Sequence, residues 1–309
     1  MSPAPIRLDG QVAIVTGAGH GLGRSYAVAL AARGARVVCN DVAGERAHEA
    51  AREIVAAGGQ AVAETSSVAT ADGGAAIVEA ALRAFGSVQI LVSNAGQLRN
   101  AAFDEMAVDD WRQVIDTHLS GAFYVTQPAY RHMRTAGYGR IVFASSSAGL
   151  FGSPWQANYG AAKAGLVGLC NVVALEGAAH GIVANSILPM AFTGIGEGGP
   201  PAYAPEQMQA TMDALGPLIP RMTVEQCAPL VVYLASARCT ESGRVLSVGC
   251  GHVGHAFVGA ARPWFAPGPD VMTPEDVEAI LAVACDRTAY EVPESMNDHS
   301  RFLARHLPE

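Results

Sequence analysis

The chain has 309 residues, of which 50% are hydrophobic and 16% are charged, and its formal net charge is −8. This length suits one open α/β sheet with an extension, and the apolar fraction is sufficient for a large buried core. The acidic balance excludes the basic surface that nucleic-acid binding requires. The first ten residues lack a secretory signal pattern, and no apolar run reaches the ~18 residues of a membrane span. We therefore expect neither nucleic acid nor a membrane as partner.

Cysteine and histidine usage argues against disulfide and metal chemistry. The six cysteines form no Cys-x-x-Cys pair and several lie in apolar runs, where reduced, buried thiols are expected. This favours a cytoplasmic location. His252 and His255 lie three residues apart near Cys250, but these residues do not complete a metal-ligand set, so we expect no metal site.

Strand and helix patterns alternate along most of the chain. Strands are predicted at residues 12–15, 36–40, 60–64, 90–92, 141–144, 183–187 and 245–248, and helices at 23–33, 44–57, 70–85, 108–134, 159–180, 206–215 and 223–236. The helix at 108–134 is expected to bend near Gly121 or Pro128. Thr223 is expected to cap its helix, with Gln226 completing a capping box. The alternation predicts a doubly wound, parallel, seven-stranded sheet of the Rossmann type, with helices on both faces.

Two later segments differ from this alternation. Residues 194–205 are rich in glycine and proline, and we interpret the region at about 190–222 as a mobile substrate segment, with a plain surface loop as the alternative. Thr273, followed by proline and two acids, predicts a helix to about residue 285. We expect residues 1–251 to form the catalytic domain and residues 252–309 an extension packed on it.

Tyr159 and Lys163 are one helical turn apart, so the phenol and the ammonium share a helix face. A nearby ammonium lowers the pKa of a phenol, which makes tyrosine usable as an acid or base. Ser146 lies thirteen residues upstream of the tyrosine. It belongs to a run of three serines, so a neighbouring serine is the alternative. These three residue types suggest hydride transfer at an alcohol carbon.

A glycine-rich turn from Thr16 to Gly23 follows the first strand and opens a helix. Small residues let the backbone approach a pyrophosphate, and the helix N-terminus supplies N–H groups. Asp41 ends the second strand, where a carboxylate bonds the adenosine ribose and repels a 2′-phosphate. We therefore predict NAD rather than NADP as the cofactor, with a structural turn and a capping aspartate as the alternatives.

Together with Asn94-Ala95-Gly96, these patterns resemble the short-chain dehydrogenase/reductase family over residues 8–250. The resemblance implies that Tyr159 is the general acid/base, Ser146 holds the substrate oxygen, and Lys163 bonds the nicotinamide ribose. It also implies a cofactor site that comprises Gly17, Gly19, His20, Gly21, Leu22, Gly23, Asp41, Ser66, Ser67, Asn94, Ala95, Gly96, Tyr159, Lys163 and Pro189.

Several positions depart from the family pattern. His118 stands where most members have asparagine, whose proposed role uses only the backbone carbonyl. Ser66 stands where an aspartate usually contacts the adenine, so that contact is expected to be weaker. Ser93 replaces an asparagine, and Met190 replaces the glycine that usually follows the proline.

Motifs around Thr117–Phe123, Gly139–Val142, Gly149–Tyr159 and Leu175–Gly177 resemble a narrower branch, the (3R)-hydroxyacyl-CoA dehydrogenase domain of peroxisomal multifunctional enzyme type 2. This resemblance implies a (3R)-hydroxyacyl-CoA or steroid-derived substrate. It also implies a homodimer or homotetramer through the helices at 108–134 and 159–180. The cations available for a CoA nucleotide are Arg99, Arg140 and Arg221.

Two other functions remain open at this point. One is a dehydrogenase of a small alcohol or sugar, and the other is a non-catalytic NAD-sensing protein on the same fold.

Overall fold

The computed structural model describes residues 4–193, 205–266 and 271–308. The chain divides into two compact units, Met1–His255 and Ala256–Glu309. The first unit contains the sheet and every predicted site residue.

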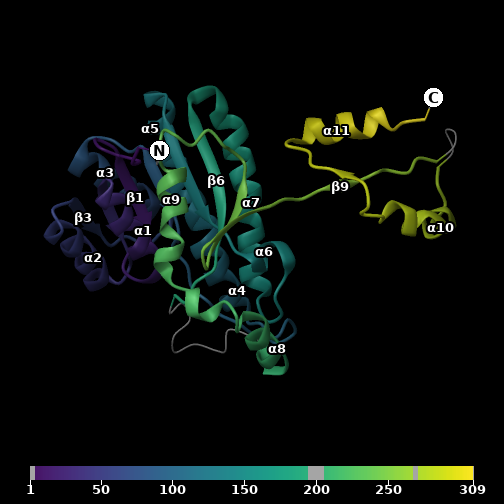
Figure 1. Cartoon of the computed structure of the whole chain (residues 1–309), viewed down its shortest axis with the longest axis horizontal. Helices are drawn as coiled ribbons and strands as arrows, with labels where there is room; N and C mark the ends of the chain where they lie inside the picture. Colours follow the sequence, from purple (N-terminus) through teal and green to yellow (C-terminus); the bar gives the residue numbers. More distant parts are fainter. Residues whose placement is uncertain (1–3, 194–204, 267–270, 309) are drawn as a thin grey trace. The chain divides into compact units, whose positions relative to one another are not determined.

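Most elements of the first unit match the predicted alternation (Figure 1). The strands are β1 (Val12–Thr16), β2 (Arg36–Asn40), β3 (Gln60–Glu64), β4 (Ile90–Ser93), β5 (Gly139–Ala144), β6 (Ile182–Pro189), β7 (Val245–Gly249) and β8 (His252–Ala256). The helices are α1 (Gly21–Ala32), α2 (Gly44–Ala56), α3 (Ala71–Phe85), α4 (Val108–Ile115), α5 (Gly121–Ala136), α6 (Ser147–Phe151), α7 (Ala157–Gly177), α8 (Pro205–Leu215) and α9 (Ala228–Leu234).

The sheet has the order β3-β2-β1-β4-β5-β6-β7-β8 and is parallel from β3 to β7. Alternate residues of β1 enter two cores. Ala13 and Val15 pack with α1, α2 and α9, whereas Val12 and Ile14 pack with α3, α5 and α7. Helices therefore cover both faces, which confirms the predicted doubly wound α/β class. The strand order reverses between β1 and β4, and ligands of open α/β sheets bind at the carboxyl ends of strands at such a point.

The predicted strand number is wrong by one, because β8 adds an eighth strand. Only Cys250 and Gly251 separate β7 from β8, so the two strands form a hairpin. Both connecting residues have positive φ, 52° and 83°, as a type I′ turn requires. Cysteine is an unusual residue for this turn, which explains why no hairpin was expected.

The predicted helix at 108–134 is interrupted. A π-helical segment, Asp116–Ser120, separates α4 from α5. The interruption lies immediately before Gly121, one of the two expected positions, and Pro128 lies inside α5.

The predicted capping box at Thr223 is wrong. Its side chain makes no cap hydrogen bond, and the segment begins with a short 3-10 turn, Val224–Gln226, before α9.

The second unit contains α10 (Pro274–Ala284), α11 (Met296–Arg305) and a short antiparallel pair, β9 (Ala260–Ala261) with β10 (Tyr290–Glu291). Thr273 caps α10 through a reciprocal bond with Asp276, as the sequence predicts for this helix start. The packing of this extension on the catalytic domain stays a prediction. Most of the glycine- and proline-rich stretch lies outside the described residues.

By length and composition alone, helix α7 with its 3-10 continuation, Ala157–His180, could cross a membrane. No apolar run of that length was predicted from the sequence. One third of its most apolar window is buried inside the protein. Because it packs on the sheet and carries the buried Lys163, we interpret it as a core helix.

Candidate active site

The glycine turn between β1 and α1 leaves no room for side chains. A Cβ on Gly23 would collide with the carbonyl oxygen of Gly17, and a Cβ on Gly17 would lie 2.8 Å from Ala95 Cα. Gly17 also has a φ of 64°, a backbone conformation that favours glycine. The turn is therefore built for close backbone approach, as a pyrophosphate site needs.

Thr16 joins this turn to the segment after β4. Its Oγ1 accepts the backbone N–H groups of Asn94 (2.9 Å) and Ala95 (3.0 Å), and the Asn94 Nδ2 donates to the Thr16 carbonyl (3.1 Å). Thr16 is buried, so these bonds are shielded from water. They fix the two halves of the switch point relative to each other.

Asp41 lies at the carboxyl end of β2 and is 8% exposed. Its Oδ2 accepts the backbone N–H of Gly19 (3.0 Å), and its Oδ1 accepts that of Ala43 (2.9 Å). The carboxylate therefore braces the glycine turn, and both of its oxygens keep further lone pairs for ribose hydroxyls.

A cavity of about 580 Å³ lies at this switch point, within the usual range for small-molecule sites. Its lining includes predicted cofactor residues from the segments that follow β1, β2, β3 and β4, namely Gly17, His20, Gly21, Leu22, Gly23, Asp41, Ser67, Asn94, Ala95 and Gly96. Among the residues that the structure describes, the buried Nδ1 of His20 has no hydrogen-bond partner. A cavity with crowded glycines and this orphaned polar atom fits a dinucleotide.

Other predicted cofactor residues lie outside the lining of this cavity. Gly19 donates its backbone N–H to Asp41 and lies against that side chain. Ser66 follows β3, where its carbonyl accepts from Asn40 Nδ2 (2.9 Å). Pro189 ends β6 opposite Val248. Tyr159 and Lys163 come from α7.

Lys163 is buried beneath Tyr159. The residue is only 4% exposed. Its Nζ donates to the Ala144 carbonyl (2.5 Å) and lies 5.4 Å from the centroid of the Tyr159 ring. Burial lowers the pKa of Lys163 to about 7, because the apolar surroundings disfavour the ammonium. It is also the only lysine in the chain.

The structure distinguishes the three serines after β5. Ser145 is buried and its Oγ donates to the Lys163 carbonyl (2.7 Å), so it serves to hold α7. Ser147 is exposed. Ser146 is half-buried and caps α6, with its Oγ accepting the N–H of Ala148 (3.2 Å). Its hydroxyl proton stays available for a substrate oxygen, which favours the predicted register.

His118 is the one buried residue of the π-helical segment. Its ring meets the Tyr159 ring edge-on, with centroids 5.2 Å apart at 90°. Burial, and secondarily the charge of Lys163, hold the pKa of His118 well below its ordinary value. The imidazole is therefore neutral.

Two expected roles on the periphery need revision. Arg140 is not a cation for a CoA nucleotide, because it is 7% exposed and donates to the carbonyls of Ser236 (3.0 Å) and Gly139 (2.8 Å). Arg99 is partly neutralised by Asp110 at 3.1 Å. Among the described residues, no group of three histidine, cysteine or acidic side chains could hold a metal ion.

Sequence reasoning missed several residues of the cavity. Arg46 lines it from α2, and its Cβ packs over Gly19. Gln97 and Thr193 also line it. None of these belongs to a spacing pattern, although the place of Arg46 in the first turn after Asp41 was a usable signal.

The fold and this arrangement define a nucleotide-binding oxidoreductase class, and the chain belongs to the short chain dehydrogenase family, whose model matches residues 11–194. It is 45% identical over 253 residues to a short-chain type dehydrogenase/reductase of Mycobacterium tuberculosis, which covers 79% of this chain and 83% of that protein. It is 38% identical over 309 residues to peroxisomal multifunctional enzyme type 2 of Mus musculus, covering 96% of this chain and 39% of that enzyme.

A solved structure of full-length peroxisomal multifunctional enzyme type 2 from Drosophila melanogaster is similar with a TM-score of 0.78 at 33% identity, over 97% of this chain and 50% of that chain. The resemblance predicted from the motifs is thus confirmed. The chain spans half or less of the length of these multifunctional enzymes.

Proposed function

We propose that the protein is an NAD(H)-dependent dehydrogenase that interconverts a secondary alcohol and a ketone. The observation that carries this proposal is the contact of Tyr159 with the buried Lys163, whose Nζ lies 5.4 Å from the centroid of the tyrosine ring, in a family member with a formed dinucleotide cavity. A non-catalytic NAD-binding protein has no need of a lysine buried at such cost.

Each of the three side chains has a defined task in this proposal. Ser146 Oγ donates to the substrate oxygen and holds it beside Tyr159. Tyr159, as phenolate, accepts the hydroxyl proton when the alcohol is oxidised and returns it on reduction. Lys163, when protonated, stabilises that phenolate. The nicotinamide supplies the hydride acceptor when it is bound.

The preference for NAD over NADP rests on Asp41. Its carboxylate is fixed at the end of β2 by two backbone N–H groups, so it cannot swing away from a 2′-phosphate. We expect Asp41→Ala to weaken NADH binding about tenfold, because the hydrogen bonds of the carboxylate to the ribose are lost. The difference between the dissociation constants for NADH and NADPH should also become smaller, because the carboxylate no longer repels the 2′-phosphate. Fluorescence titration with both reduced cofactors measures this ratio.

The substrate class proposed is a (3R)-hydroxyacyl-CoA or a steroid-derived secondary alcohol. The support is similarity to multifunctional enzymes over nearly the whole chain, including its extension. The mobile substrate segment predicted at about 190–222 lies partly outside the described residues and, like the packing of the extension, stays a prediction. The six free cysteines support a reducing, cytoplasmic location.

An apolar face on α7 supports a homo-oligomer. The exposed positions of this helix include Ala164, Gly168, Val172 and Leu175, spaced three and four apart. Val172 and Leu175 are 52% and 54% exposed. A second copy that packs on this face removes the apolar surface from water, in a dimer or a tetramer. Sedimentation analysis of the protein and of Leu175→Glu tests the interface, since a buried charge would dissociate it.

The deciding experiment is NADH formation from a panel of (3R)-hydroxyacyl-CoA thioesters, hydroxysteroids and simple secondary alcohols. We expect turnover of the thioesters, its near-complete loss in Tyr159→Phe, and retained NADH binding in that variant. Tyr290→Phe removes an exposed phenol of the second unit and is the matched control. An active Tyr159→Phe enzyme would refute the mechanism. Turnover restricted to small alcohols would refute the substrate class, and cofactor binding without any turnover would favour the NAD-sensing alternative.

A further inference from the structure

His118 connects the catalytic tyrosine with the cofactor cavity through two separate contacts. It lies in the π-helical segment Asp116–Ser120 and is 2% exposed. Single π-helical turns place a side chain where a regular helix would not, and they are frequent at functional sites. Here the side chain so placed is the imidazole.

The first contact is made by the ring. His118 packs edge-on against Tyr159 at 5.2 Å, and Lys163 Nζ lies 5.4 Å from the centroid of the same phenol ring. Tyr159 therefore has an aromatic neighbour from the α4–α5 region and a cation from its own helix. Edge-to-face packing fixes the plane of a ring more narrowly than aliphatic contact does.

The second contact is made by the polar edge. His118 Nε2 lies 3.0 Å from the backbone nitrogen and 2.8 Å from the backbone oxygen of Gln97. Either tautomer bonds Gln97, by accepting from its N–H or by donating to its carbonyl. Within the described part of the chain, the Nδ1 atom is buried without a partner and Nε2 makes the hydrogen bonds of the ring.

The segment held in this way belongs to the cavity. Gln97 lines it and directly follows Asn94, Ala95 and Gly96, which also line it. A Cβ on Gly96 would collide with His118 Cε1, so the imidazole fills the space next to this backbone. Burial and Lys163 keep the imidazole neutral, so it adds no charge beside the lysine.

We propose that His118 is a positioning residue whose ring orients Tyr159 for proton transfer and whose polar edge holds Gln97 at the wall of the cofactor cavity. This inference rests on the proposed dehydrogenase function. It assigns a role to the side chain itself, whereas the family asparagine at this position was expected to act through its backbone carbonyl.

Two variants separate the two contacts. His118→Asn keeps a group that can bond Gln97 but removes the ring, so we expect kcat to fall about tenfold to a hundredfold, as small misplacement of a reacting group does. Its NADH dissociation constant should stay within about threefold. His118→Phe keeps the ring and removes the polar edge. We expect it to weaken NADH binding about tenfold, because a partly buried backbone group of Gln97 loses its partner, while kcat at saturating cofactor changes less than in the asparagine variant.

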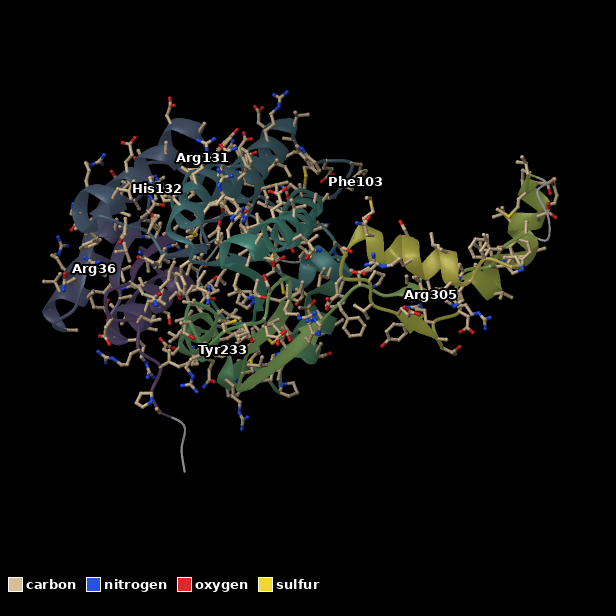
Figure 2. All side chains as sticks on the ribbon, turned by 90° about the horizontal axis from the view of Figure 1, so that it is seen from above. Arg36, Phe103, Arg131, His132, Tyr233 and Arg305 are labelled. Carbon is tan, nitrogen blue, oxygen red and sulfur yellow. The ribbon has the colours of Figure 1, made fainter. Side chains whose placement is uncertain are left out.

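The matched control is His132→Asn, the same substitution at an exposed histidine of α5 (Figure 2), which should alter neither quantity. The inference is overturned if both variants lower kcat and NADH affinity in parallel with thermal stability, or if His118→Asn retains full kcat. If His118→Phe does not fold, the split between kcat and NADH affinity in His118→Asn decides alone. The NADH titrations need no turnover, so a cofactor-binding protein that oxidises no alcohol would count against the proposed function and leave the Gln97 contact testable.

Discussion

Replacing Lys163 by methionine should stabilise the cofactor-free protein while it destroys turnover. Lys163 is 4% exposed, and burial lowers its pKa from 10.5 to about 7. At pH 7 the unfolded chain is fully protonated at this position and the folded chain about half, so folding must displace protons from the amine. A difference of three to four pKa units corresponds to about 4 kcal/mol against folding at pH 7.

Methionine matches the length of the lysine stem and avoids this cost, but it leaves the Ala144 carbonyl without the lysine's hydrogen bond. Such a loss costs about 1–3 kcal/mol. The net expectation is that Lys163→Met is more stable by about 1–3 kcal/mol at pH 7. Because the folded pKa is lowered, the unfolded state binds more protons between pH 7 and pH 10.5, so the stability of the unsubstituted protein rises with pH across this window. The advantage of methionine should therefore vanish by about pH 10.

Urea denaturation of the cofactor-free proteins at pH 7, 8, 9 and 10, at one protein concentration, measures this difference. Subtracting the two curves cancels the titration of tyrosines and cysteines, and no other lysine contributes. Arg83→Met removes an exposed cation of α3 and should show no such pH dependence. A methionine variant that is less stable at pH 7, or whose advantage is constant from pH 7 to pH 10, would refute the reasoning.

Three further outcomes are expected. Thr16→Val leaves two partly buried backbone N–H groups without their acceptor and should lower the free energy of unfolding by about 2–4 kcal/mol in urea titrations. Gly23→Ala should abolish NADH binding in fluorescence titrations, whereas Gly44→Ala, whose Cβ would meet only Thr65 Cγ2 at 3.5 Å, should retain it. The pKa of His118 lies below its ordinary value in the folded protein. As pH falls, this imidazole is therefore protonated at a higher pH in the unfolded chain than in the folded one. Stability should therefore fall as pH decreases below about 6.5, with a shallower slope in His118→Asn.

The sequence was sufficient for the parallel sheet because its strands are buried on both faces and read as short apolar runs, such as Val12–Val15. It was equally sufficient for the glycine turn, where steric crowding demands one residue type. It could not reveal β8, since its hairpin uses Cys250 at a positive φ. The choice of Ser146 rested on the spacing to Tyr159, whereas in the structure burial and the bond from Ser145 to the Lys163 carbonyl distinguish the three serines. The burial of Arg140 could not be predicted either, because its partners include the carbonyls of Ser236 and Gly181, which are distant in sequence.

Helix α7 combines tasks that are usually assigned to different elements. One side packs in the core, the first turns carry Tyr159 and Lys163, and the exposed side presents Val172 and Leu175. If copies of the protein associate through the exposed side of α7, a change in subunit association acts on the same helix that carries Tyr159. Specific activity should then depend on enzyme concentration, and dilution would act on this enzyme as an inhibitor does.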